Sequence, residues 1–314
     1  MALNLNLLRS FHAVAEAGSV SRAAKKGFIS QPALSKAVRE LEKSVGIPLV
    51  ERSARGVHLT EAGKTLYEHA KTLFALEREA EEAIGSHRNM ETGTLRIGAS
   101  TTLTSYVLPP LLAQFRQLQP HLRFKTLRGN TRDIEALLGA YELDVALVEG
   151  PSHHPRVQAR PWGEDELVCV CAPDHPLARQ ENVWPKQLGD YEWVMREEGS
   201  GTREVIENVF RPYKLPPQDA LEVGGAEALK QAIAAGLGIG IVSRVAAADQ
   251  IALGKLVVVP LAEMELRRPF YLLRLKGRPL SPAAAAFENF LREHRGGSTF
   301  TGVKRKSKKL NDKA

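Results

Sequence analysis

Cysteine is scarce in this chain, and long apolar runs are absent. The only two cysteines are Cys169 and Cys171, too few for a closed structural zinc site. They stand two residues apart on a probable strand and bridge poorly, so we expect small buried hydrophobic side chains, with a redox role as the alternative. No apolar run approaches the roughly 20 residues that span a bilayer. The N-terminus lacks the pattern of a signal peptide, and a cytoplasmic location is therefore predicted.

Positive charge is distributed unevenly along the 314 residues, whose formal net charge is +7. Residues 1–58 carry nine Lys and Arg against four Glu, and residues 301–314 carry six against one Asp. Each of these segments has a net charge of +5, and the remaining 242 residues sum to −3. This distribution is typical of nucleic-acid binding at the basic ends. The tail, residues 296–314, is expected to be disordered, either as a solubilising segment or as a nonspecific grip on DNA.

Residues 31–45 have the pattern of a helix with one apolar and one polar face. Ser30 is a suitable N-cap and Pro32 is tolerated in a first turn. The apolar stripe consists of Leu34, Val38, Leu41 and Val45. The opposite side presents Gln31, Pro32, Ser35, Lys36, Arg39 and Lys43. Gln reads adenine, Lys and Arg read guanine or bind phosphate, and Ser serves either purpose, so a DNA recognition helix is predicted. An ordinary amphipathic helix with a solvated face is the alternative.

The flanking sequence favours the recognition helix. A helix ending near Gly18 precedes it, followed by a short helix that Ser19 caps. Residues 47–51 and 57–59 are predicted to form two strands around a wing whose Arg52 and Arg55 reach phosphates or a minor groove. Together these elements predict a winged helix-turn-helix.

Residues 4–63 resemble the DNA-binding domain of the LysR-type transcriptional regulators. The matching segments are Phe11 to Ser19, Arg22-Ala23-Ala24, Ser30 to Ser35, Leu41-Glu42, Glu51-Arg52 and Leu59 to Gly63. Gly27 stands where the family usually has a buried Leu, and Val50 stands where Phe is common. We expect Phe28 or Ile29 to fill the gap at Gly27. The resemblance implies a homodimer or homotetramer that binds double-stranded promoter DNA and acts on RNA polymerase.

Residues 60 to about 86 are predicted to form one long linker helix. Leu59, Leu66, Leu73 and Ala80 recur every seven residues, and Ala62, His69, Leu76 and Ala83 occupy the d-like positions. A helix pair between two chains is favoured, as the resemblance also implies, and packing against the chain's own domains is the alternative. Gly85, Ser86, Asn89, Thr92 and Gly93 predict a hinge.

Strand and helix patterns alternate beyond Gly93, which predicts an α/β architecture with largely parallel sheets. The resemblance implies a C-terminal effector domain with two lobes, like a periplasmic binding protein. We place the crossings between the lobes near residues 148–162 and 260–270. The predicted domains are the winged helix-turn-helix (1–59), the linker helix and hinge (60–92), the effector domain (93–295) and the tail (296–314). Lobe I covers about 93–160 and 270–295, and lobe II covers about 163–266.

The resemblance implies that two loops bind an effector between the lobes, and their chemistry suits that role. Residues 100–102 follow the first strand, and residues 197–203 open a helix; both bring hydroxyls and backbone amides to a helix N-terminus, which suits an anion. Plain helix capping is the alternative for either loop alone. The candidate residues are Ser100, Thr101, Thr102, Glu149, Ser200, Thr202, Arg203 and Gly225.

The chemistry of these loops suits a small anion, such as a carboxylate, sulfate, sulfite or a sugar phosphate. Residues 196–203 resemble the subgroup of the family that includes regulators of carbon fixation and sulfur assimilation. We expect no cofactor, metal or catalytic residue. The glycines at 236, 238 and 240 follow a helix and precede a strand, the reverse of a dinucleotide loop. The alternative function is a small-molecule binding protein or enzyme whose helix-turn-helix serves protein interaction.

Overall fold

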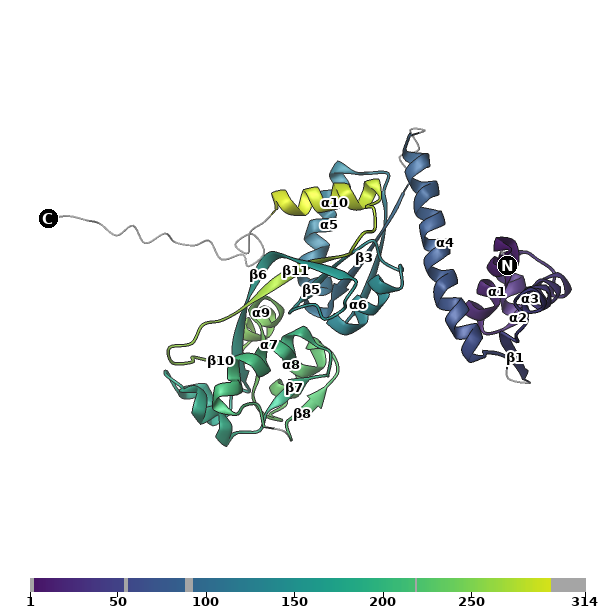
Figure 1. The fold of residues 1–314 in the computed structure, drawn as a ribbon. Coiled ribbons are helices and arrows are strands. Elements are labelled where there is room, and N and C mark those ends of the chain that lie inside the picture. Colours follow the sequence, from purple (N-terminus) through teal and green to yellow (C-terminus); the bar gives the residue numbers. More distant parts are fainter. Residues whose placement is uncertain (1–2, 54–55, 88–92, 218, 295–314) are drawn as a thin grey trace. The chain divides into compact units, whose positions relative to one another are not determined.

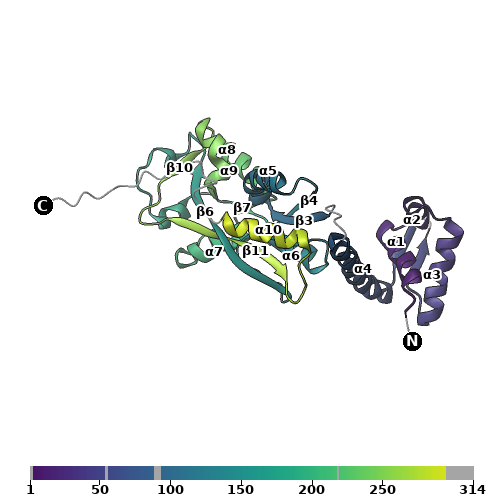
Figure 2. The same cartoon turned by 90° about the horizontal axis from the view of Figure 1, so that it is seen from above.

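The computed structural model describes residues 3–53, 56–87, 93–217 and 219–294. It divides into two compact units, residues 1–89 and 90–314. Figures 1 and 2 show the elements within each unit. In the part of the chain that is described, no helix combines the length and apolar character needed to span a membrane.

Three helices form the centre of unit 1, as predicted: α1 (Leu5–Ala17), α2 (Val20–Gly27) and α3 (Gln31–Val45). The hydroxyl of Ser19 caps α2, and that of Ser30 caps α3. Gly18 (φ 60°) and Gly46 (φ 77°) end α1 and α3 in the left-handed conformation that favours glycine. Leu34, Val38 and Leu41 of the predicted apolar stripe are buried, together with Leu8, Phe11, Val14, Ala23 and Ala24.

The wing consists of β1 (Val50–Ser53) and β2 (Gly56–Leu59), which pair antiparallel with Val50 opposite Leu59. We predicted that the first strand starts at residue 47, and it starts three residues later. The reason is Glu42, whose Oε1 accepts hydrogen bonds from the amides of Leu49 (2.8 Å) and Val50 (3.1 Å). One carboxylate of α3 therefore fixes where the wing begins.

The turn between α2 and α3 differs from our expectation. Phe28 does not fill the gap left by Gly27, because its side chain is 99% exposed. It caps α2 in the left-handed conformation, with φ 53°. Ile29 comes closer, since its Cδ1 lies 3.7 Å from where a Cβ of Gly27 would be.

The linker helix is α4 (Glu61–His87), which continues through Gly85, one of the residues predicted to form a hinge. Ala70 and Phe74 of α4 are buried in the core of unit 1, and Leu66 and Leu73 pack against that core. The a-like positions Leu66 and Leu73 therefore contact the chain's own domain, whereas Ala80 is exposed. Leu76 and Ile84 are exposed and remain available for a helix pair.

Unit 2 contains a seven-stranded sheet in the order β10-β6-β11-β5-β3-β4, with β9 paired to β6. The prediction of largely parallel sheets is wrong: β3 is parallel to β4 and β5, but β6, β9, β10 and β11 form antiparallel pairs. The difference arises from β6 and β11, which run along each other through both lobes with a register shift between Phe270 and Tyr271. Figure 1 shows these two long strands side by side. Their bounds are Val157–Cys171 and Leu266–Leu275, slightly later than the predicted crossings.

Each lobe has its own core. The helices of lobe I cover β3, β4 and β5, and apolar clusters lie on both faces of that part of the sheet. Two further clusters lie in lobe II, one of which contains both cysteines. Burial raises the pKa of the Cys171 thiol to about 11 and that of Cys169 further, which agrees with the prediction of buried hydrophobic residues. Lobe I contains β3 (Thr94–Ser100), α5 (Leu108–Leu118), β4 (Arg123–Gly129), α6 (Thr131–Gly139), β5 (Val145–Glu149) and α10 (Pro282–Glu293).

Lobe II includes a second sheet that the sequence did not predict in full. It pairs β7 (Val194–Arg196) with β8 (Leu221–Val223) in parallel, and β8 was missed because its three residues carry no clear alternation. The other elements of lobe II are α7 (Gly201–Phe210), α8 (Ala226–Ala234), β9 (Gly240–Ser243), α9 (Arg244–Ala252) and β10 (Val257–Val259).

Candidate functional site

The polar face of α3 is accessible. Gln31, Pro32, Lys36 and Arg39 are exposed, and Ser35 is half-buried between them. Ser30 lies at the helix start, where its hydroxyl accepts from the amide of Ala33 at 3.4 Å. The predicted contact residues therefore share one side of a helix whose other side is anchored in the core of unit 1.

Two of the cations on this face, Lys36 and Arg39, are only weakly held. Lys36 Nζ lies 3.8 Å from Glu40 Oε1, at the outer limit of an ion pair. Arg39 Nε donates to the backbone oxygen of Ser35 at 3.3 Å, and no carboxylate of the described residues forms an ion pair with Arg39. Charges so arranged attract phosphates at little cost in desolvation.

The wing is described only in part. The backbone of Arg52 belongs to β1, and Arg55 lies outside the described residues. Their contact with DNA stays a prediction.

In unit 2, the two predicted effector loops meet at a residue that the sequence reasoning missed. Arg268 of β11 is fully buried, and its Nη1 donates to Thr202 Oγ1. Its Nη2 donates to Thr102 Oγ1 at 3.4 Å. Thr102 and Thr202 are themselves 2% and 4% exposed. One guanidinium therefore joins the threonine of the first loop to the threonine of the second.

Two carboxylates also face Arg268. Asp165 of β6 accepts from Nε at 2.8 Å and from Nη2 at 2.6 Å, and Glu149 Oε1 lies 3.6 Å from Nη2. The hydroxyl of Ser243 donates to the other oxygen of Asp165 at 3.1 Å. Burial raises the pKa of Asp165, although Arg268 opposes this shift. The cluster therefore has two carboxylates for one guanidinium, out of contact with water.

A small cavity borders this cluster, and its lining is rich in cations and hydroxyls. Arg196, Lys230 and Arg268 lie around it, and no carboxylate belongs to the lining. Each of the three cations is at least 95% buried. Three hydroxyls complete the polar lining: Thr102, Thr202 and Ser243.

Each of the other two cations also has a carboxylate partner, which is Glu197 for Arg196 and Glu227, at 2.9 Å, for Lys230. Arg196 forms two 2.7 Å hydrogen bonds with Glu197, which also accepts from the amide of Gly225 at 2.9 Å. Burial alone would raise the pKa of Glu197, but these hydrogen bonds outweigh it and lower the pKa to about 2. The amide of Gly225, predicted to bind effector, is therefore directed to Glu197.

Lys230 connects the lobes. Its ammonium donates to the Ala246 carbonyl at 2.6 Å and to the Tyr106 hydroxyl at 3.0 Å. Tyr106 belongs to a π-helical turn, Leu103–Val107, which directly follows Thr102. Such turns are frequent at functional sites.

The remaining candidates lie around the cluster. Ser100 and Ser200 are buried, and Thr101 is half-buried. Arg203 turns away toward Glu207 and Glu222, with which it forms ion pairs. Arg203 is thus the candidate whose position fits an effector contact least.

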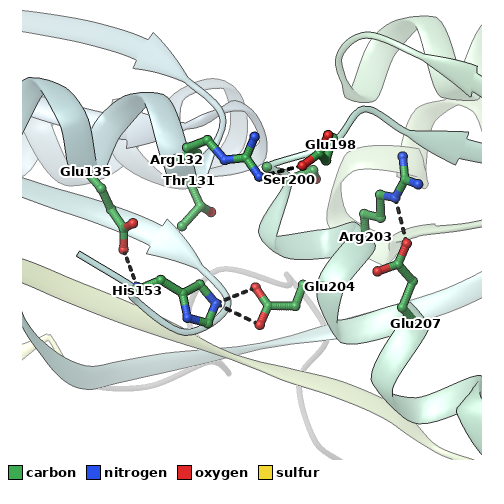
Figure 3. Close-up of a pocket in the computed structure, with 10 residues that line it drawn as sticks. Thr131, Arg132, Glu135, His153, Glu198, Ser200, Arg203, Glu204 and Glu207 are labelled. Atoms are coloured by element: carbon green, nitrogen blue, oxygen red, sulfur yellow. Dashed lines mark hydrogen bonds and ion pairs between the residues drawn. The ribbon is translucent and has the colours of Figure 1, made fainter. Parts of the chain in front are cut away.

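A larger groove, with a volume of about 500 Å³, lies between α6 and α7. Figure 3 shows that its charged side chains pair with each other across it, Arg132 with Glu198 and His153 with Glu204. Glu135 of the same groove accepts from the amide of His153. Its four glutamates outnumber its two arginines, which disfavours an anion. The cavity beside Arg268 is lined by cations, but its volume of about 10 Å³ admits an anion only when the lobes move apart.

The lobes approach closely beside the cluster because two glycines permit it. A Cβ at Gly201 would lie 1.6 Å from the Glu149 carbonyl oxygen, and one at Gly150 would lie 2.9 Å from the Gly201 Cα. Either added methyl group would push the lobes apart, so these positions govern how closely the effector residues meet.

The sequence contained one usable signal for Arg268. Residues alternate along β11, with Leu266, Arg268 and Phe270 buried and the residues between them exposed. Strand alternation places Arg268 on the inner face. Asp165 is likewise in phase with the buried Leu167 and Cys169 on β6. Charged residues in phase with a buried strand face were therefore detectable as a pair.

Comparison with known proteins agrees with both parts of the chain. Residues 5–64 match the family described as bacterial regulatory helix-turn-helix protein, lysR family, and residues 88–296 match the LysR substrate binding domain. The RuBisCO operon transcriptional regulator of Allochromatium vinosum is 34% identical over 93% of this chain and 96% of its own length. The regulator CysL of Bacillus subtilis is 35% identical over 76% of this chain and 80% of its own.

Among solved structures, the regulatory domain of CcmR from Synechocystis in complex with 2-PG is similar to the effector part. It superposes with a TM-score of 0.60 at 31% identity and covers 65% of this chain and 98% of that domain. The resemblance inferred from the sequence is thereby confirmed. The chain belongs to the LysR family of transcriptional regulators, with a helix-turn-helix domain and an effector-binding domain.

Proposed function

We propose that this regulator responds to a small organic or inorganic anion bound between its lobes, in the cavity beside Arg268. The observation that carries the proposal is the lining of that cavity, in which three buried cations stand with three hydroxyls and no carboxylate. An anion there gains charge-assisted hydrogen bonds in a medium of low dielectric constant. The effector classes that suit it are carboxylates, sulfate or sulfite, and sugar phosphates.

The threonines supply the link to regulation. Thr102 belongs to lobe I and Thr202 to lobe II, and Arg268 lies on the strand that joins the lobes. An anion that contacts both threonines favours one relative arrangement of the lobes. A ligand shifts a conformational equilibrium only when it binds one state better than the other, and contacts to both lobes satisfy that requirement.

On DNA, we propose that α3 enters the major groove with Gln31, Ser35, Lys36 and Arg39 directed at bases or phosphates. Ser30 and Pro32 would sit at the tip of the helix, and Arg52 and Arg55 of the wing would contact the backbone. Two chains, paired through exposed side chains of α4 such as Leu76 and Ile84, would read a partly symmetric site and act on RNA polymerase. The alternative of an interaction-only helix-turn-helix is not favoured, because the family is one of transcriptional regulators.

Titration calorimetry on the full chain tests the anion site. The first probe is 2-phosphoglycolate, because the similar CcmR domain is complexed with 2-PG; sulfate and sulfite follow. Thr102→Ala and Thr202→Ala should each weaken the binding of whichever anion binds by about tenfold, or about 1.4 kcal/mol. Thr126→Ala, an exposed threonine on β4, is the control. Unchanged affinity in both cleft variants would refute the proposed site.

A further inference from the structure

The cluster around Arg268 contains a buried acceptor without a donor. Glu149 is 3% exposed, and among the described residues its Oε1 has no hydrogen-bond partner. The hydroxyl of Ser100, at the end of the adjacent strand, is 2% exposed and likewise lacks a partner. Burial of a polar atom without a partner is unfavourable. Such atoms in a well-packed sheet require an explanation, and contact with a bound ligand is one.

Arg268 does not satisfy Glu149, because its nitrogens are already engaged. Nε and Nη2 bond to Asp165, and Nη1 bonds to Thr202. The 3.6 Å between Nη2 and Glu149 Oε1 exceeds hydrogen-bond length. With two carboxylates for one guanidinium, no described residue donates a hydrogen bond to Glu149 Oε1, whereas the neighbouring cavity offers cations and hydroxyls. Glu149 does not line that cavity, but it lies 3.6 Å from Arg268, which does. A ligand that binds beside Arg268 after the lobes move apart can therefore meet Glu149 as well as the cations.

We infer that the effector is an anion that also carries a hydrogen-bond donor, a hydroxyl or ammonium group, and that Glu149 accepts from this donor. The inference rests on the proposed anion site and narrows its ligand class. Hydroxy acids, amino acids and sugar phosphates meet both requirements, whereas sulfate, sulfite and 2-phosphoglycolate meet only the first. Glu149 is then the residue that selects among anions, because an anion without a donor leaves its buried oxygen unpaired.

Three ligands with the same three-carbon skeleton make the test. Propionate has no donor, lactate adds a hydroxyl, and alanine adds an ammonium group at the same carbon. Glycerol 3-phosphate and propyl phosphate form the corresponding pair with a phosphate. Calorimetry on the full chain should give at least about tenfold tighter binding for the donor-bearing member of one set, which corresponds to about 1.4 kcal/mol.

Two substitutions test whether Glu149 causes the preference for donor-bearing ligands. Glu149→Leu removes the acceptor, so the ratio of the affinities for the donor-bearing and the donor-free ligand should fall to about one. Glu149→Gln keeps an acceptor oxygen but loses its charge, so an intermediate preference is expected. Glu164→Gln is the matched control, since Glu164 lies on the exposed side of β6 with 56% of its side chain accessible; it should keep the wild-type preference.

The stability of the ligand-free protein distinguishes a role of Glu149 in ligand binding from a role in holding the fold together. Because Oε1 of Glu149 makes no hydrogen bond, the ligand-free Glu149→Gln chain should unfold at the wild-type urea concentration or above it. Lower stability, or an unchanged preference in Glu149→Leu, would overturn the inference. Equal binding of donor-bearing and donor-free anions would overturn it and leave the proposed function intact. If no anion binds, or binding is insensitive to Thr102→Ala and Thr202→Ala, the proposed function fails as well.

Discussion

The cations of the two units are used in opposite ways. On α3, Lys36 and Arg39 are exposed and weakly paired. Beside the cleft, Arg196, Lys230 and Arg268 are buried, and each is held by carboxylates or carbonyls. The exposed pair costs the fold little and is screened by salt. The buried set is expensive to desolvate and tolerates only a ligand that fits between fixed partners.

This contrast indicates how the two activities are separated in one chain. Substitutions on α3 should change DNA binding and leave folding intact, because those side chains contact solvent. Substitutions in the cleft should change stability and ligand binding together, because the same contacts serve both.

The largest effect is expected from Arg268. Arg268→Met leaves Asp165 and Glu149 buried without their cation, which should destabilise unit 2 by about 3–5 kcal/mol. All three tryptophans, Trp162, Trp184 and Trp193, lie in this unit, so urea unfolding followed by tryptophan fluorescence measures it directly.

Arg267 provides the matched control on the same strand. Its side chain is 47% exposed and pairs with Glu164 and Glu265 at 3.3 Å. Arg267→Met should cost no more than about 1 kcal/mol. Similar losses in the two variants would remove the distinction between buried and exposed cations.

The next largest effect on stability is expected from Glu197, and it should depend on pH. Its folded pKa of about 2 lies below the unfolded value of about 4.3. The carboxylate therefore stabilises the fold above about pH 4.3, and this contribution is lost as the pH falls toward 2. At pH 7, Glu197→Gln should lower the free energy of unfolding by an amount on the order of 2–3 kcal/mol.

The shape of the pH profile is the decisive measurement. The difference between Glu197→Gln and wild type should shrink from pH 5 downward and vanish near pH 2 (roughly the folded pKa). Glu198→Gln is the control, because Glu198 is exposed and its pKa is lowered mainly by the surface bond from Arg132. A difference that stays constant with pH would show that Glu197 acts through packing.

On the exposed side, Arg39→Ala should weaken binding to a specific DNA site by about 1–3 kcal/mol if the guanidinium contacts a base. If it contacts phosphate, the loss should be uniform across sequences and the salt slope should fall by about one. Fluorescence anisotropy at several salt concentrations distinguishes the two. Lys255→Ala, an exposed cation of unit 2, should change neither, and the unfolding midpoint of Arg39→Ala should equal that of wild type.

The same contrast explains what the sequence could predict. Solvent-facing elements follow local rules, so the caps Ser19 and Ser30, the helices of unit 1 and the face of α3 were correct. The loops with Thr102 and Thr202 were proposed from local chemistry together with the family resemblance, although their contact with an effector stays a prediction. Their meeting point was not, because Arg268 lies 66 residues from Thr202 and 166 from Thr102. Only the antiparallel crossing of β6 and β11 brings them together, and we had predicted largely parallel sheets.

Local rules failed at one exposed position as well. Phe28 was expected to fill a gap, but its left-handed backbone directs the ring into solvent. A side chain with a Cβ is disfavoured there, and a turn can adopt that conformation even when its residue suits it poorly. This makes Phe28 the position where the exposed surface of unit 1 carries avoidable strain.

Replacing Phe28 by Asn, which tolerates the left-handed region, should raise the stability of unit 1 by about 0.5–1 kcal/mol. Thermal unfolding followed by helical circular dichroism measures the gain. Ile29→Asn is the control: Ile29 is 49% exposed and does not have positive φ, so no gain is expected. If Phe28→Asn is more stable than wild type and binds DNA with the same affinity, the backbone strain at Phe28 has no role in DNA binding. If the affinity for DNA falls while the stability of unit 1 rises, the ring of Phe28 contacts DNA. This exposed residue then lowers stability and raises binding affinity, as we propose for the buried residues of the cleft.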